Sequence, residues 1–185
     1  MIKIENIKIY DLEESVKASK YPMATNTEAV NSEITNTVIS LANSSKGEGH
    51  DQFLTGIRVN FDLTCSNKMW IEAERYRFLE FVSSQSTMHR ISKFDIENQC
   101  NKYVTSNTVD EVNRLKDVYN NNPTPENYLF LLYNIPSGFQ LTARLTTNDR
   151  CLKTIYSQRK NHRLPEWREF CKFIDVLPYS ELITD

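Results

Sequence analysis

The sequence has 185 residues and a mass of 21.6 kDa, which is enough for one domain with a packed core. Hydrophobic residues make up 39% and charged residues 25%, a composition that argues against intrinsic disorder. The formal net charge of −2 excludes a global attraction to nucleic acids or anionic membranes, so an anion site requires a local cluster of Arg and Lys. With only four glycines, a Gly-rich phosphate-binding loop is nearly excluded.

The N-terminal segment and the cysteines indicate a protein of the cytoplasm. Residues 1–10 alternate apolar and charged side chains and lack the continuous apolar region of a signal peptide. No stretch approaches 18 uninterrupted apolar residues, so we expect no membrane span. The four cysteines match no metal-binding spacing; they are Cys65, Cys100, Cys151 and Cys171. We expect no metal site and reduced thiols, most of them small semi-buried side chains.

Hydrophobic periodicity predicts a single α+β domain over residues 1–185, with an antiparallel or mixed sheet and long helices. A period of two predicts strands at 2–10, 54–64 and 139–145. A period of 3.6 predicts helices at 27–42, 67–81, 108–120, 148–159 and 166–174. Residues 82–88 are expected to form a polar loop. Residues 128–133 form a short apolar run whose structure stays open.

Arg75 and Arg77 form the first of two arginine-rich segments and precede a Ser-rich stretch at 83–87. If they lie on one helix, their side chains leave it about 200° apart, which suits a ligand that wraps the helix or two ligands on either side. The planar guanidinium group is a natural partner for phosphate because it donates two parallel hydrogen bonds. The alternative is that these arginines form surface ion pairs with neighbouring glutamates.

The second segment contains Asn148, Arg150 and Arg159, followed by Arg163 and Arg168. Asn148 and Arg159 are eleven residues apart, or three helical turns, so they share nearly the same helix face and can line one cleft. A solvated basic face is the alternative.

His50 follows a Gly-Glu-Gly stretch and leads into a predicted strand, which is a reasonable place for a binding loop. A structural role for this histidine stays open. The sequence contains no nucleophile elbow and no His/Cys/Asp cluster with metal-ligand spacing.

Three blocks of the sequence, taken in order, resemble the flavin-dependent thymidylate synthases. The first is Gly49-His50 ahead of an alternating strand. In the second, Ser66 is followed six residues later by Glu72 and then by Arg75-Tyr76-Arg77. The third block consists of Asn148-Asp149-Arg150-Cys151-Leu152, Tyr156, Arg159 and Glu166-Trp167-Arg168. Pro136 also stands where the family has a proline ahead of a strand. The blocks lie within residues 47–90 and 133–170, about half of the chain.

The resemblance implies a homotetramer that binds FAD between subunits and methylates dUMP to dTMP with methylenetetrahydrofolate and NADPH. It implies the fold of that family and a location in the cytoplasm of a bacterium or a phage-infected cell. The catalytic residues that it implies are His50 and Arg159. The FAD-binding residues that it implies are Arg75, Arg77, Asn148 and Arg150. The residues that it implies for the pyrimidine deoxynucleotide are Glu72, Ser84, Gln85, Ser86 and Arg159.

The chain departs from the family pattern at several of these positions. Tyr76 replaces the central His of the signature, Glu80 replaces its first Ser, and Leu132 replaces an Arg. Glu72 replaces a Gln, and a carboxylate repels phosphate unless it is paired or protonated. A carboxylate that only accepts hydrogen bonds would also suit a base with an amino group, such as cytosine.

Three functions follow as alternatives. The first is a divergent FAD- and folate-dependent enzyme that transfers a one-carbon unit to C5 of a pyrimidine nucleotide. The second is a non-catalytic nucleotide-binding protein of the same fold, encoded by a phage or mobile element. The third is a structural α+β oligomer in which the arginines form surface ion pairs.

Overall fold

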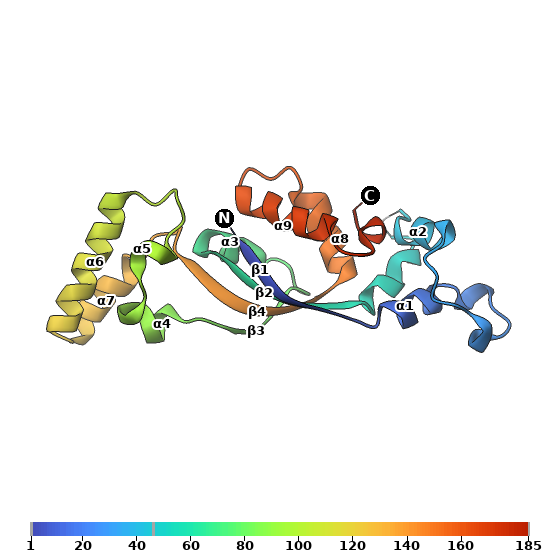
Figure 1. Cartoon of the computed structure of the whole chain (residues 1–185), viewed down its shortest axis with the longest axis horizontal. Helices are drawn as coiled ribbons and strands as arrows, with labels where there is room; N and C mark the ends of the chain where they lie inside the picture. The colour runs from blue at the N-terminus through green and yellow to red at the C-terminus, as the bar shows by residue number, and fades with distance from the viewer. Residues whose placement is uncertain (1, 46, 185) are drawn as a thin grey trace.

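The computed structural model describes residues 2–45 and 47–184, and it confirms an α+β fold. Four strands form one antiparallel sheet in the order β1-β2-β4-β3. Three helices, α3 (Asn67–Ala73), α8 (Asp149–Arg159) and α9 (Pro165–Asp175), cover one face of this sheet, and the other face is open (Figure 1).

The central strands are β2 (Arg58–Ser66) and β4 (Gln140–Asn148), and both bury every second side chain. Val59, Phe61 and Leu63 on β2 are fully buried beneath the helices. The ring centroid of Phe61 lies 5.7 Å from that of Phe170 on α9. Polar side chains occupy the alternate positions on the open face, so this period of two fixes which face meets the helices.

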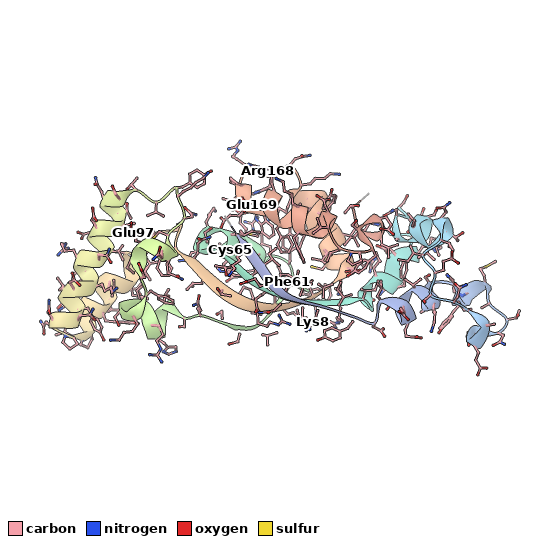
Figure 2. All side chains as sticks on the ribbon, viewed as in Figure 1. Lys8, Phe61, Cys65, Glu97, Arg168 and Glu169 are labelled. Atoms are coloured by element: carbon pink, nitrogen blue, oxygen red, sulfur yellow. The ribbon has the colours of Figure 1, made fainter. Side chains whose placement is uncertain are left out.

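The edge strands are β1 (Lys3–Tyr10) and β3 (Glu80–Ser84). The pairing of β1 with β2 shifts at a bulge where Asn6 adopts a positive φ of 51°. Asn6 donates to Asp62 at 2.5 Å, and Arg144 on β4 binds the same carboxylate at 3.2 Å. This polar contact joins three strands across the open face, the side from which Lys8 projects (Figure 2).

Two hydrophobic clusters lie along the sheet. The larger one fills the layer between the sheet and α3, α8 and α9. The smaller one fills a helical lobe at one end of the molecule, built from α4 (Thr87–Arg90), α5 (Ile96–Gln99), α6 (Ser106–Asn121) and α7 (Pro125–Tyr133) (Figure 1). Strand β4 belongs to both, because Leu141 packs in the lobe whereas Ala143 and Leu145 pack in the larger cluster.

The opposite end of the molecule carries α1 (Leu12–Ser19) and α2 (Asn36–Ala42) (Figure 1). Five short 3-10 helices complete the described elements: η1 (Tyr21–Met23), η2 (Thr27–Ala29), η3 (His50–Thr55), η4 (Ile91–Lys93) and η5 (Ser180–Leu182). Within residues 2–45 and 47–184, no helix has the length and apolarity needed to cross a bilayer.

The predicted helix over 27–42 is wrong in its first half, because the α-helix covers only Asn36–Ala42 and a single 3-10 turn, η2, lies at Thr27–Ala29. Thr35 begins the helix by accepting a hydrogen bond from the backbone N–H of Val38. The segment before it is held by Lys20, whose ammonium group donates to the carbonyls of Asn31 and Glu33. The side chain of Lys20 therefore supplies the bonds that a helix would otherwise make within itself.

The predicted helix over 67–81 is also too long, since α3 ends at Ala73. Two successive turns follow, in which Tyr76 donates to the carbonyl of Ala73 and Leu79 donates to that of Tyr76. These turns bury every third residue and so imitate a helical period. The predicted loop at 82–88 is wrong as well, because the edge strand β3 lies at Glu80–Ser84.

The remaining predicted elements are present. The strands at 2–10, 54–64 and 139–145 correspond to β1, β2 and β4, and the helices at 108–120, 148–159 and 166–174 correspond to α6, α8 and α9. The second of these strands is predicted to start too early, because Leu54 and Thr55 lie in η3 and β2 begins at Arg58. The apolar run at 128–133 lies in α7.

Candidate functional site

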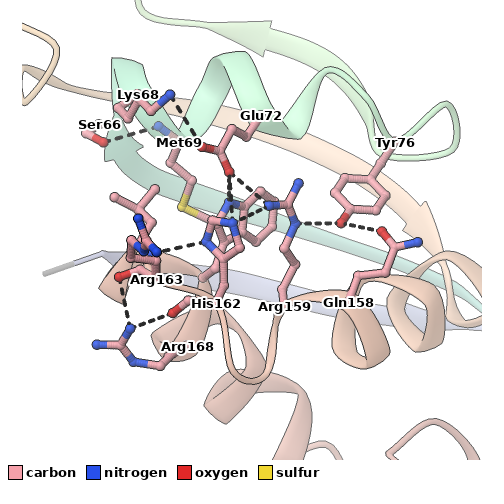
Figure 3. Close-up of polar contacts among 12 residues, drawn as sticks. Ser66, Lys68, Met69, Glu72, Tyr76, Gln158, Arg159, His162, Arg163 and Arg168 are labelled. Atoms are coloured by element: carbon pink, nitrogen blue, oxygen red, sulfur yellow. Dashed lines mark hydrogen bonds and ion pairs between the residues drawn. The ribbon is translucent and has the colours of Figure 1, made fainter.

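Glu72, Tyr76, Arg159, His162 and Trp167 form a polar group between α3, α8 and α9, which we call the Arg159 cluster (Figure 3). Arg159 Nη1 lies 2.9 Å from Glu72 Oε2 and 2.7 Å from His162 Nε2. Arg159 Nε donates to the Tyr76 hydroxyl at 2.7 Å, and Trp167 Nε1 donates to Glu72 Oε2 at 3.0 Å. The structure thus brings together two of the residues predicted for the nucleotide, Glu72 and Arg159.

The cluster is largely buried and internally neutralised. The side chains of Arg159 and Glu72 are 11% and 14% exposed, and the guanidinium carbon lies 4.8 Å from the Trp167 ring centroid. Burial alone would raise the pKa of Glu72. Hydrogen bonding from Trp167 and the charges of His162 and Arg159 outweigh burial and hold that pKa below its ordinary value. Glu72 is therefore an ionised partner of Arg159 at neutral pH.

Tyr76, which the resemblance places at the signature histidine, makes two hydrogen bonds through its hydroxyl. It accepts from Arg159 and donates to Gln158 Oε1 at 2.9 Å. Burial raises the pKa of Tyr76, while Arg159 acts in the opposite direction. Tyr76 therefore positions Arg159 as a neutral phenol.

A second group forms where η3 meets the start of α8, and we call it the Arg150 corner. Arg150 Nε donates to Asp51 at 3.2 Å, and Arg150 Nη1 donates to Gln52 at 2.8 Å. His50 is exposed and directly precedes these partners, after Gly49 with a φ of 79°. Asn148 caps α8 by accepting from the backbone N–H of Cys151 at 2.9 Å. The corner therefore gathers three predicted residues: His50, Asn148 and Arg150.

Asn148 and Arg159, which we expected to line one cleft, are far apart along α8. They stand at opposite ends of α8, about 16 Å apart at 1.5 Å per residue over its 11 residues. The side-chain oxygen of Asn148 caps α8, so this residue has a structural role in addition to any role in binding. The Arg150 corner and the Arg159 cluster are thus two separate groups on one chain.

Arg75 and Arg77 lie in the turns between α3 and β3, and not on a helix as expected. Both side chains are exposed, and neither forms an ion pair with another described residue. Arg77 lies over the neighbouring Phe78 ring at 5.6 Å. The alternative in which these arginines pair with nearby glutamates is therefore wrong for this pair.

Ser84, Gln85 and Ser86 follow the exposed edge of the sheet and join neither of these groups. Gln85 continues the pairing with β4, since its backbone N–H donates to Thr142 and its side chain accepts from Thr142. Ser86 precedes α4, and its hydroxyl makes no capping bond. The side chains of Ser84 and Ser86 remain open to a ligand or to another chain.

Two other motif residues, Ser66 and Glu166, bind each other in the interior. The Ser66 backbone N–H donates to Glu166 Oε1 at 2.8 Å, and its hydroxyl donates to Oε2 at 2.5 Å. Ser66 also caps α3 through Met69. This link fixes the start of α9 against the end of β2.

Sequence reasoning did not assign a role to Trp167, His162, Lys68 or Gln158. Trp167 was part of the third block, and its indole nitrogen is a donor that must find an acceptor when buried. Lys68 lies four residues before Glu72 on α3, the spacing of a helical ion pair, and its ammonium group is 3.4 Å from that carboxylate.

Asp149 is a buried carboxylate that follows the β4 strand. It is fully buried, and no hydrogen bond of ordinary geometry reaches either of its oxygens from the described residues. Tyr179, also fully buried, faces it from the C-terminal segment. Burial raises the pKa of Asp149 to about 8, only partly offset by Tyr179, so the carboxyl group carries a proton at neutral pH.

The cysteines are free thiols; Cys65, Cys151 and Cys171 are more deeply buried than expected, and Cys100 is half-buried. Burial raises the pKa of Cys171 to about 11, with Asp175 acting in the same direction. Among the described residues, no three His, Cys, Asp or Glu side chains are grouped to hold a metal ion.

Comparison with solved structures identifies the fold. Two structures of the flavin-dependent thymidylate synthase ThyX from Helicobacter pylori with FAD and dUMP superpose with TM-scores of 0.75 and 0.73 at 14% and 13% identity. They match 100% and 99% of this chain and 96% of the ThyX chain. The resemblance to flavin-dependent thymidylate synthases is therefore confirmed for the fold.

A second enzyme has the same fold. The UMP/dUMP methylase PolB from Streptomyces cacaoi, bound with 5-Br dUMP, aligns over 98% of this chain and 92% of its own, with a TM-score of 0.63 and 14% identity. No family model matches the sequence, and no curated protein is detectably similar to it.

Proposed function

We propose that this protein is a divergent thymidylate synthase-like enzyme that binds FAD and a pyrimidine deoxynucleotide and transfers a one-carbon unit to C5 of the base. The full-length agreement of the fold with ThyX bound to FAD and dUMP carries the proposal. A fold accommodates several functions, so the residues of the site must support the same conclusion.

The exposed arginines suit the flavin. Arg75 and Arg77 present unpaired guanidinium groups on adjacent turns, and Arg pairs well with the diphosphate of FAD. In this proposal Asn148 and Arg150 face the flavin from the start of α8, with His50 beside it. FAD would supply the redox chemistry of the transfer, with methylenetetrahydrofolate as one-carbon donor and NADPH as reductant.

Arg159 and Glu72 would contact the nucleotide, with Ser84, Gln85 and Ser86 completing its site. Within one chain these residues form separate groups. A site assembled between subunits would unite them, so we propose a homo-oligomer, a tetramer by analogy with the family. The protein would work in the cytoplasm.

The ion pair between Glu72 and Arg159 supports a second candidate, a nucleotide-binding protein without catalysis. The guanidinium group of Arg159 already lies 2.9 Å from the carboxylate of Glu72. A ligand must displace this carboxylate before it can bind Arg159. The same ion pair would also suit a base that offers an amino donor to Glu72, such as cytosine. A purely structural role remains the third candidate.

Absorbance between 300 and 500 nm tests the proposal directly. The purified protein should retain a flavin band after FAD addition and desalting, and should then release the C5 proton of dUMP or dCMP. Nucleotide binding without a flavin band would favour the second candidate. Absence of both would exclude the enzyme and the nucleotide-binding module.

A further inference from the structure

A pocket of about 600 Å³ lies where the helical lobe meets the helices over the sheet, and we call it the junction pocket. Its walls come from the start of α3 (Ser66, Lys68), the loop 101–104, the turn at 137–138 and the segment 164–169. Figure 2 shows Arg168 and Glu169 at the end of α9 nearest the lobe that carries Glu97. None of the residues proposed for FAD or the nucleotide lines it, so this pocket is a separate site.

The loop on the lobe side is held in a defined conformation. The backbone N–H of Asn101 donates to the carbonyl of Gly138 at 2.9 Å, and that of Tyr103 donates to the Asn101 side chain at 3.0 Å. A Cβ on Gly138 would come within 2.5 Å of Val104 and 2.9 Å of Asn101. A larger residue at 138 would have to displace these two side chains, so the glycine lets the loop lie close to the turn at 137–138, with Lys102 and Tyr103 in the lining of the pocket.

The charges around the pocket favour an anion. Its two carboxylates already have donors within the chain: Glu166 binds Ser66, and Glu169 accepts from the backbone N–H of Ile2 at 2.9 Å. Three cationic side chains also line the pocket, Lys68, Lys102 and Arg168. Lys68 is shared with Glu72, and Arg168 uses its Nη1 on the carbonyls of His162 and Arg163, so Lys102 and the other N–H groups of Arg168 remain for a ligand.

The lining also includes apolar residues and an aromatic ring. Val104 and Tyr103 contribute from the lobe side, and Leu164 and Pro165 contribute from the segment 164–169; Tyr103 is 69% exposed. The Lys102 ammonium group lies 5.2 Å from the Tyr103 ring centroid. An exposed ring beside cationic donors provides a stacking surface and an anion contact at the same place.

We propose that the junction pocket binds a small anionic molecule with a planar ring, held by Lys68, Lys102 and Arg168 at its anionic group and by Tyr103 at its ring. This proposal does not depend on the proposed enzymatic function. Lys68 also contacts Glu72, so an anion in the pocket competes for the ammonium group that borders the Arg159 cluster.

1-Naphthyl phosphate is a suitable probe, titrated into the full chain by isothermal calorimetry. We expect one saturable site per chain that neutral 1-naphthol does not fill. Lys102→Ala and Tyr103→Ala should each weaken binding about five- to tenfold, because the first removes one of the cationic contacts to the anionic group and the second removes the contact to the ring. Both residues are exposed, so unchanged melting temperatures should show that the variants are folded.

Lys8→Ala is the matched control, since it removes the same charge from the open face of the sheet. If Lys8→Ala lost as much affinity as Lys102→Ala, the loss would depend only on the net charge of the protein, and the proposal would be overturned. Displacement of the probe by dUMP, with full affinity retained in Lys102→Ala, would place the probe at the nucleotide site and also overturn it. Absence of saturable binding at millimolar probe would do the same. The FAD absorbance test remains independent of all these outcomes.

Discussion

The carboxylate of Glu72 lies 2.9 Å from the guanidinium group of Arg159 and accepts a second hydrogen bond from Trp167 at 3.0 Å. Both members of this ion pair are nearly buried, so an anionic ligand must compete with a carboxylate that is already in place. The pair is therefore the first part of the site to test.

Glu72→Gln should increase the affinity for a pyrimidine nucleotide about tenfold, because it removes the charge that competes for Arg159 and keeps the shape of the side chain. It should cost about 2 kcal/mol of unfolding free energy by weakening a mostly buried ion pair. Calorimetry with dUMP and urea denaturation measure the two effects. The exposed Glu74→Gln serves as control. An unchanged dUMP affinity in Glu72→Gln would show that Arg159 does not contact the nucleotide.

Asp149→Asn should stabilise the protein at neutral and alkaline pH. The folded state keeps a proton on Asp149 up to about pH 8, whereas the unfolded chain loses it near the ordinary value of 3.8. Stability contributed by this residue is thus complete below pH 4 and declines as the pH rises to 8. At pH 8 the variant should be more stable by an amount on the order of 3 kcal/mol.

Denaturation of the wild type and Asp149→Asn at pH 5 and pH 8 measures this difference. Asp110→Asn on the exposed surface of α6 should leave the pH dependence of the wild type unchanged. Equal pH slopes for the wild type and Asp149→Asn would contradict the assignment of a protonated Asp149.

Ser66→Ala should destabilise the fold by about 2 kcal/mol, because it removes the α3 cap and leaves Glu166 Oε2 without its donor. Ser86→Ala is a matched control, since that hydroxyl caps nothing, and it should change stability by less than about 0.5 kcal/mol. Thermal melts compare the two variants directly. A loss of equal size in both would show that the bond between Ser66 and Glu166 contributes nothing specific.

The double variant Arg75→Ala/Arg77→Ala should weaken FAD binding at least tenfold and leave the melting temperature unchanged, because both side chains are exposed and make no ion pair. Flavin titration followed by absorbance measures the affinity. Arg114→Ala on α6 removes an exposed arginine that is paired only with Glu111 and serves as control. Full FAD affinity in the double variant would remove these arginines from the proposed flavin site.

Sequence periodicity predicted the strands that bury one face and missed the strand that does not. Alternation is visible in β2 because Val59, Phe61 and Leu63 all point to the helices. All five residues of β3 are exposed, so its sequence carries no such signal. The burial of Ala73, Tyr76 and Leu79 through consecutive turns extended the apparent helix over residues that are not helical.

The candidate site was predictable as a set of residues and not as a set of contacts. The motif spacing selected Glu72 and Arg159, but their contact depends on how α3 and α8 lie across the sheet. The bond between Ser66 and Glu166 spans 100 residues of sequence, and no local pattern indicates it. In the proposed function, exposed positions such as Arg75 and Ser86 gain their role only from a ligand or a second subunit.

Strand β4 passes through both hydrophobic clusters, with Leu141 in the lobe and Leu145 under the helices. It also lies between β2 and β3, so its backbone amides are paired on both sides. The lobe cannot detach without disturbing this strand, and the two clusters should therefore unfold in a single cooperative step. In native-state hydrogen exchange, the β4 amides should be among the slowest in the chain, exchanging only when the whole molecule opens.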